Sequence, residues 1–250
     1  MTKFSVITVC YNSEKTIAET IQSVKKQSFK DYEHLIVDGL SSDNTGKIVD
    51  AHKDNKIAFV SEKDNGLYDA MNKGILKANG EYIVFLNSDD FFADEYVLQK
   101  VDLISSSLPD FIYGGIRYFS ENQKGARTWM PENFTTIKHK KLQIPHPGVF
   151  IRREHIIENK RLFDTTLQIA ADLKQQLELI HIDNRTGMLA REILVNMRLG
   201  GKSTDGILAF IRGWKESLRV YVELFGVIGI YYCCRKVLHK LPQISNKVQY

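Results

Sequence analysis

The sequence contains few cysteines and neither of the common glycine-rich nucleotide loops. Its three cysteines, Cys10, Cys233 and Cys234, have no spacing typical of a disulfide framework or a zinc site, so we expect a reducing compartment. The segment Thr8–Asn12, after the first expected strand, holds no G-x-G-x-x-G, and no P-loop occurs. These absences argue against dehydrogenases and P-loop ATPases.

The sequence also lacks a run of the about 20 apolar residues that a simple membrane span needs. Its N-terminus enters a strand pattern at once, without the charged and apolar regions of a secretory signal, so we expect a cytoplasmic protein. One uncharged segment, Leu224–Cys234, has eleven residues and precedes Arg235 and Lys236. Such a segment suits a helix at a membrane surface, or a helix packed on the protein or on a dimer partner.

Charge is unevenly distributed along the 250 residues. Residues 206–250 carry seven Lys or Arg and two acids, a net charge of +5, whereas the remainder carries −1. A basic tail can meet anionic lipid or nucleic acid. The rest of the chain lacks a basic stripe, which disfavours nucleic acid as a partner.

The first hundred residues alternate strand and helix patterns, which indicates βαβ units and a mainly parallel sheet. Expected strands are residues 4–9, 32–37, 56–60 and 82–86, and 67–78 is an expected helix. Beyond residue 90 the pattern changes. There we expect strands around a glycine bend at 111–119, a returning strand near 127–130, a loop at 131–145, a short strand at 149–151, a helix at 170–180 and C-terminal helices.

A polar tetrad, Asn87–Asp90, follows the apolar run Tyr82–Leu86. That run has β-branched and aromatic residues and predicts a buried strand. Open α/β sheets bind ligands at the carboxyl ends of their strands. Carboxylates there suit a divalent cation, and the cation suits diphosphate oxygens. By itself, such a tetrad is more often a polar turn in which Asp caps a helix.

Other candidate groups also have structural alternatives. Asp38 ends the second strand and can accept a hydrogen bond from a base or ribose, although Asp-Gly is a common turn. The string Glu62–Asn72 includes Asp64, which suits a helix cap or a ligand contact. His146, between two prolines, is more often structural than a base. Asp172 follows an apolar stretch and is either a helix N-cap or a general base.

In their order along the chain, these strings resemble the family 2 glycosyltransferases of the GT-A fold, which build bacterial polysaccharides. The matching strings, over roughly residues 3–203, are Ser5–Asn12, Val37–Gly39 with Ser41, Asp43 and Thr45, Glu62–Gly74, Gly80–Asp90, His146–Pro147 and Ala171–Asp172. The resemblance implies an α/β, Rossmann-like fold: a mainly parallel sheet with flanking helices, a small antiparallel addition and a C-terminal helical tail. We expect a GT-A domain over 1–205, with a donor half at about 1–110 and an acceptor half at 111–205, followed by a basic helical segment at 206–250.

The resemblance also implies a role for each candidate residue. Donor contacts fall on Thr8, Tyr11, Asp38, Asp64, Asn72, Asn87, Ser88 and Asp90. The family's Asp-x-Asp metal motif falls on Asn87–Asp89, so Asp89 is the implied ligand of Mn²⁺ or Mg²⁺, and the asparagine removes one negative charge. Asp172 matches the family's catalytic base, His146 falls on the acceptor side, and Lys202 could reach phosphate from a late loop.

Together these features predict an inverting transferase that moves a sugar from a nucleotide-sugar, such as a UDP-sugar, to a hydroxyl of a glycan or lipid-linked acceptor in cell-surface polysaccharide synthesis. We expect it in the cytoplasm, peripheral on the inner face of the cell membrane through its tail, with a homodimer left open. Two alternatives remain. Asn87 favours a non-catalytic nucleotide-sugar or glycan-binding protein, whereas the absence of a glycine-rich triphosphate loop disfavours a nucleotidyltransferase.

Overall fold

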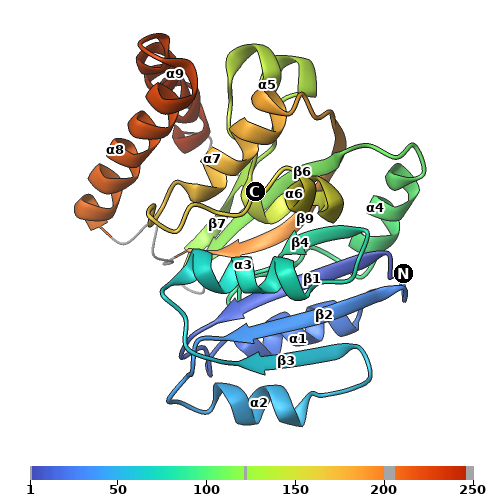
Figure 1. Cartoon of the computed structure of the whole chain (residues 1–250). Helices are drawn as coiled ribbons and strands as arrows, with labels where there is room; N and C mark the ends of the chain where they lie inside the picture. Colours follow the sequence, from blue (N-terminus) through green and yellow to red (C-terminus); the bar gives the residue numbers. More distant parts are fainter. Residues whose placement is uncertain (1, 121–122, 200–205, 246–250) are drawn as a thin grey trace.

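The computed structural model describes residues 2–120, 123–199 and 206–245, and its described strands form one sheet (Figure 1). The strand order is β3-β2-β1-β4-β8-β6-β9-β5, with β7 paired to β6. The strands are β1 (Phe4–Cys10), β2 (Tyr32–Asp38), β3 (Ile57–Ser61), β4 (Tyr82–Phe85), β5 (Phe91–Phe92), β6 (Phe111–Ser120), β7 (Gln123–Trp129), β8 (Val149–Arg152) and β9 (Gly187–Arg198).

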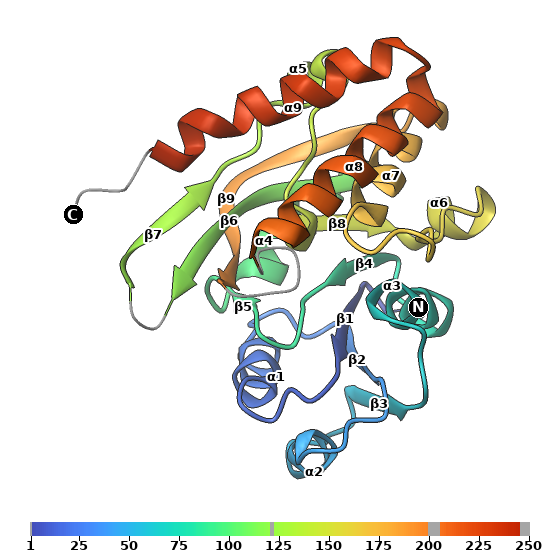
Figure 2. The same ribbon diagram turned by 90° about the vertical axis from the view of Figure 1, so that its left-hand side faces the viewer.

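Helices cover both faces of the sheet (Figure 2). They are α1 (Ile17–Lys25), α2 (Thr45–Ala51), α3 (Leu67–Lys77), α4 (Val97–Ser105), α5 (Phe134–Lys140), α6 (Arg153–Glu158), α7 (Ala171–Leu177), α8 (Gly206–Phe225) and α9 (Ile228–Ser245). A 3₁₀ turn, η1 (His146–Gly148), precedes β8, and a π-helical turn, η2 (Glu178–Ile182), continues α7. This arrangement confirms the predicted α/β architecture with a C-terminal helical tail.

The half of the sheet from β3 to β4 is parallel. All seven residues of β1 are buried, as expected for a strand covered by helices on both faces. α3 packs on the face that presents Ile7 and Leu35, and α1 packs on the face that presents Ile36. Parallel pairing brings the strand ends together, so Cys10 stands opposite Asp38, and Asp38 opposite Ser61. The loops that leave these strands therefore share one edge.

The other half of the sheet is mixed. β8 is antiparallel to both β4 and β6, whereas β6 and β9 are parallel. β6 runs through the glycine pair as one strand, where the sequence predicted two. Glycine is needed at residue 114 because a Cβ there would lie 2.6 Å from the Leu194 side chain. The glycines thus allow close packing of β9 without breaking the strand.

The predicted loop at 131–145 is wrong, because α5 occupies Phe134–Lys140. The Asn133 side chain caps this helix by accepting the backbone N–H of Thr136. The helix ends at Lys141, which adopts a left-handed conformation. The short length of α5 and its single fully buried apolar residue, Ile137, left little periodicity to detect.

The tail is a hairpin of two helices rather than one apolar helix. Gly226 has a φ of 65° and turns the chain between α8 and α9, inside the uncharged segment Leu224–Cys234. α8 buries Val220 and Tyr221 against the body of the protein. No helix in the described ranges is long and apolar enough to cross a membrane.

A buried histidine makes stability depend on pH. The His34 ring is fully buried in β2, its Nε2 is 2.9 Å from the Thr8 hydroxyl, and burial lowers its pKa to about 3. In the unfolded chain, His34 binds a proton as the pH falls below about 6.5, whereas in the folded chain it stays neutral. The free energy of unfolding therefore decreases as the pH drops below that value. Between pH 7 and 5 we expect a loss of about 2 kcal/mol from this group.

Urea unfolding at both pH values measures this loss. In a His34→Leu variant, the Thr8 hydroxyl loses its partner, which lowers the free energy of unfolding equally at both pH values. The difference in the free energy of unfolding between pH 7 and pH 5 should therefore be smaller than in the wild-type protein. An unchanged difference would contradict the assignment to His34.

Candidate functional site

One end of the candidate site is formed by the loops after β1, β2 and β3. Tyr11 follows β1 and is 63% exposed, so its ring offers a free aromatic face. A Cβ on Gly39 would lie 2.4 Å from Asp64 Oδ2 and 3.4 Å from the Tyr11 ring. The three residues therefore meet, and glycine is required at 39 for this close approach. The other Asp64 oxygen accepts the N–H of Gly66, which leaves Oδ2 to face a ligand.

Asp38 holds the turn beside these three residues. Its Oδ2 accepts the Ser41 N–H at 3.0 Å and the Ser61 hydroxyl at 2.6 Å, and its Oδ1 accepts the Ser41 hydroxyl. Only 2% of Asp38 is exposed. The Cys10 thiol also donates to Oδ1 at 3.6 Å, so a ligand must compete with four internal donors for this carboxylate.

Two predicted donor residues are engaged elsewhere. The Thr8 hydroxyl is fully buried against His34, which corrects the expectation that this side chain lies beside the nucleoside. The Asn72 amide donates to the Phe163 carbonyl at 2.9 Å and accepts the Phe163 N–H at 2.8 Å. Asn72 thus fastens the chain before α7 to α3. It would influence a bound donor only indirectly, through the position of that segment.

The tetrad Asn87–Asp90 divides into framework and free groups. Asp90 is 1% exposed, accepts the Arg198 N–H and the Asn87 amide, and belongs to the framework. Burial, together with the charge of Asp89, raises the pKa of Asp90 to about 8. Of the two roles expected for Asp90, contact with the donor sugar or support of the site, its burial favours support. The Ser88 hydroxyl lies 2.8 Å from the Ser13 hydroxyl and ties the tetrad to the loop after β1.

The Asp89 carboxylate and the side-chain oxygen of Asn87, Oδ1, take no part in this framework. The Asn87 Nδ2 is committed to Asp90, and its Oδ1 is buried with no hydrogen-bond partner among the described residues. Burial raises the pKa of Asp89. In the described part of the chain, no group of three or more His, Cys, Asp or Glu side chains could hold a metal ion. Asp89 with Asn87 Oδ1 nevertheless fits Mg²⁺ or Mn²⁺, because such ions take one or two protein oxygens and substrate phosphates.

Arg198, at the end of β9, was not identified from the sequence. Its backbone N–H binds Asp90, its Nε lies 3.4 Å from the Asp89 carbonyl, and its guanidinium pairs with Glu19 at 2.6 Å. It therefore brings a positive charge beside the tetrad. Lys202 and the loop around it lie outside the described residues.

Asp172 is the second residue of α7 and is half-buried. The N-cap position is Ala170, so Asp172 does not cap the helix. Its Oδ2 accepts the Gln143 amide at 3.1 Å, and its Oδ1 lies 3.5 Å from the Tyr68 hydroxyl. Tyr68 belongs to the first turn of α3, which begins directly after the Asp64 loop. The N-terminus of α3 therefore lies next to both the Asp64 loop and Asp172. Gln143 lay in the predicted loop and carried no sequence signal.

His146 lies near Asp172, among aromatic rings. It stacks on Phe85 with ring centroids 5.4 Å apart and meets Phe163 edge-on at 5.7 Å. Both ring nitrogens are buried without a partner among the described residues, and burial lowers the pKa of His146. It is therefore a neutral ring that shapes the wall of the site.

Known proteins match the chain at two levels, and sequence is the first. The model of the family described as "Glycosyl transferase family 2" matches residues 5–159. The Escherichia coli UDP-Glc:alpha-D-GlcNAc-diphosphoundecaprenol beta-1,3-glucosyltransferase WfgD is 31% identical over 132 residues, 52% of each chain. The Staphylococcus aureus poly(ribitol-phosphate) beta-N-acetylglucosaminyltransferase TarS is 36% identical over 45% of this chain and 20% of TarS. The matches thus span about half or less of these curated relatives.

Structure is the second level. Residues 1–349 of S. aureus TarS, in complex with UDP-GlcNAc, align with a TM-score of 0.73 and 20% identity over 96% of this chain and 73% of that one. The Pyrobaculum calidifontis mannosyltransferase PcManGT, in complex with GDP-Man and Mn²⁺, aligns with a TM-score of 0.63 and 16% identity over 97% and 77%. These likenesses establish a shared fold.

Proposed function

Because the chain belongs to glycosyl transferase family 2 and has the GT-A fold, we propose that it transfers a sugar, with inversion, from a nucleotide-sugar to an acceptor hydroxyl. The observation that carries this proposal is the position of Asp172. A half-buried carboxylate that caps nothing accepts the Gln143 amide and lies 3.5 Å from the Tyr68 hydroxyl, on the helix that begins beside the Asp64 loop. Donor and acceptor chemistry therefore meet at one place.

We assign the nucleoside to the pocket of Tyr11, Gly39 and Asp64. Tyr11 stacks on the base, and the free Asp64 oxygen accepts a base N–H or a ribose hydroxyl. A UDP-sugar suits this pocket because a uracil imide donates such a hydrogen bond. Structures of TarS with UDP-GlcNAc and of PcManGT with GDP-Man support a nucleotide-sugar donor for this fold.

Asp89 and the amide oxygen of Asn87 would hold the divalent cation. When bound, the cation supplies positive charge that stabilises the oxygens of the leaving diphosphate. Arg198 adds a fixed positive charge beside the tetrad. With Asn87 in place of an acid and Asp90 buried, the site carries little negative charge, and we expect weak cation binding.

Asp172 acts as the general base. As the acceptor oxygen bonds to the anomeric carbon, its proton passes to the Asp172 carboxylate, and the bond from that carbon to the diphosphate breaks. Gln143 orients the carboxylate through its amide N–H, Tyr68 lies beside it, and His146 and Phe163 shape the wall next to it. One displacement from the face opposite the diphosphate inverts the anomeric centre. The acceptor is a glycan or a lipid-linked saccharide.

Release of nucleoside diphosphate tests the proposal. Purified protein with Mn²⁺ or Mg²⁺ should release diphosphate from at least one donor in a panel of nucleotide-sugars, in the presence of glycan and lipid-linked acceptors. Donor binding by calorimetry without release would select the second candidate, a non-catalytic nucleotide-sugar-binding protein, which the missing acid at residue 87 favours.

The exposed surface of the hairpin supports a membrane contact. Its exposed apolar side chains are Phe210, Ile211, Trp214, Val222, Val227, Ile228, Ile230 and Tyr231. Lys215 and Arg219 are exposed on the same hairpin. Apolar residues beside cations suit an anionic lipid surface, which would place the enzyme on the inner face of the cell membrane.

Vesicle flotation tests this contact. The protein should float with vesicles containing anionic lipid, less so at high salt, and less again after Phe210→Ser with Val227→Ser, two residues that are 68% and 83% exposed. Equal flotation of the double variant would contradict the membrane contact. A mass in solution twice that of one chain would assign the face to a homodimer.

A further inference from the structure

A carboxylate on the tail reaches the chain just before Asp172. Glu216 lies in α8, and its two oxygens accept the backbone N–H groups of Gln168, Ile169 and Ala170 at 2.8 to 3.2 Å. Three successive N–H groups that converge on one anion form a strong and directional contact. The N-cap residue of α7, Ala170, makes no side-chain capping hydrogen bond. The acceptor for the backbone N–H groups before α7 comes instead from Glu216 in the tail.

The same segment is held from the opposite side by the donor half. The Tyr68 hydroxyl donates to the Ile169 carbonyl at 2.8 Å. Residue 169 is thus fixed through its N–H by Glu216 and through its carbonyl by Tyr68. Asp172 follows three residues later, so its place beside Tyr68 and Gln143 depends on this double attachment.

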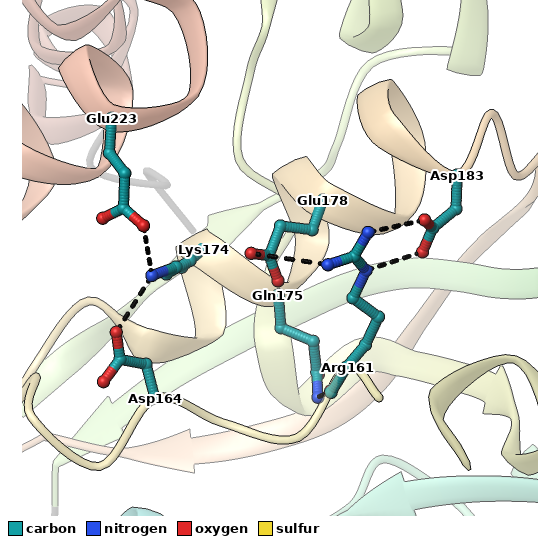
Figure 3. Close-up of polar contacts among 7 residues, drawn as sticks. All are labelled: Arg161, Asp164, Lys174, Gln175, Glu178, Asp183 and Glu223. Atoms are coloured by element: carbon teal, nitrogen blue, oxygen red, sulfur yellow. Dashed lines mark hydrogen bonds and ion pairs between the residues drawn. The ribbon is translucent and has the colours of Figure 1, made fainter. Parts of the chain in front are cut away.

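A second contact joins α7 to α8 further along both helices. Figure 3 shows Lys174 between two acids, 2.9 Å from Asp164 and 2.6 Å from Glu223 of α8. On the far side of α7, Arg161 pairs with Asp183 at 2.7 Å. The Lys174 contact uses side chains only and does not touch residues 168–170. It therefore offers a matched comparison for Glu216.

From these contacts we infer that Glu216 is a positioning residue for the general base, and that the tail completes the active site. The inference rests on the proposed function, and it extends the active site to the tail helix α8, which lies outside the family match over residues 5–159. Loss of the Glu216 contact frees the turn before α7 and displaces the Asp172 carboxylate. The nucleoside pocket does not involve this turn, so donor binding stays intact.

Glu216→Ala tests the inference, with Glu223→Ala as its control. Both variants remove one carboxylate from α8, and alanine leaves no side-chain acceptor at either position. We expect Glu216→Ala to lower kcat by about tenfold or more, because small displacements of a catalytic group are costly, with the donor KM unchanged. We expect Glu223→Ala to keep kcat near the wild-type value. Amide exchange at residues 168–170 should accelerate only in Glu216→Ala.

The outcomes separate this inference from the proposed function. If the wild-type protein transfers sugar and Glu216→Ala has an equal kcat, the inference is overturned and the function stands. Equal losses of kcat in both variants would also overturn it, because they would show a general loss of stability. If the wild-type protein transfers no sugar, the proposed function fails. Amide exchange then decides alone, and unaltered exchange at 168–170 overturns the inference.

Discussion

Asp172→Asn should lower kcat for sugar transfer by about 10²- to 10⁴-fold, the usual contribution of a positioned general base. The amide cannot take the acceptor proton, although it keeps the size of the carboxylate and can still accept the Gln143 hydrogen bond. The donor KM should change little, because the nucleoside pocket lies on other loops. Steady-state rates of diphosphate release with saturating acceptor measure the effect.

Asp164→Asn is the matched control for this result. Asp164 also lies in the acceptor half and pairs with Lys174, but no contact joins it to Asp172. We expect Asp164→Asn to retain most of the wild-type kcat. We also expect Asp172→Asn to bind nucleoside diphosphate with wild-type affinity. Undiminished transfer by Asp172→Asn would remove the proposed base.

Asp89→Asn should lower kcat/KM by about 10²-fold or more, since loss of the cation removes several kcal/mol of charge stabilisation. The reason lies in the division of the tetrad. Asp90 already holds Arg198 and Asn87, so no neighbouring carboxylate can replace Asp89. Activity titrated with Mn²⁺, and removed with a chelator, measures this dependence.

Asn87→Asp supplies the complementary test. A second acid in the tetrad should lower the Mn²⁺ concentration that gives half-maximal activity, because it restores one negative charge beside Asp89. A wild-type rate that a chelator leaves intact would contradict a role for the cation and would assign charge stabilisation to Arg198.

The parallel half of the fold could be predicted because its signals are local. β1 and β4 are short apolar runs, and α1 presents Ile17 and Ile21 one turn apart, so period and turn residues suffice. The roles of Asp89 and Asp90 could not be separated in this way. The contact that engages Asp90 comes from Arg198, 108 residues later in the chain.

The environment of Asp172 was hidden for the same reason. Its motif was visible, but its neighbour Tyr68 is 104 residues away, and Gln143 lay in a stretch predicted to be a loop. The turn at Gly226 was equally hard to foresee, because the apolar segment around it continues on both sides. Local patterns identify which residues carry chemistry, and long-range contacts decide which of them are free to use it.

α8 combines a buried contact with exposed apolar side chains. Its Glu216 fastens the turn before the helix of the base, and its Phe210 and Trp214 are exposed. If both contacts act as proposed, the protein has interfacial activation built into a single helix. Binding to the lipid surface would order α8 and, through Glu216, the segment that carries the base. A molecule in solution would still bind its donor but would transfer the sugar slowly. Membrane binding would then regulate the enzyme, and nucleotide-sugar would be consumed mainly where acceptor is present.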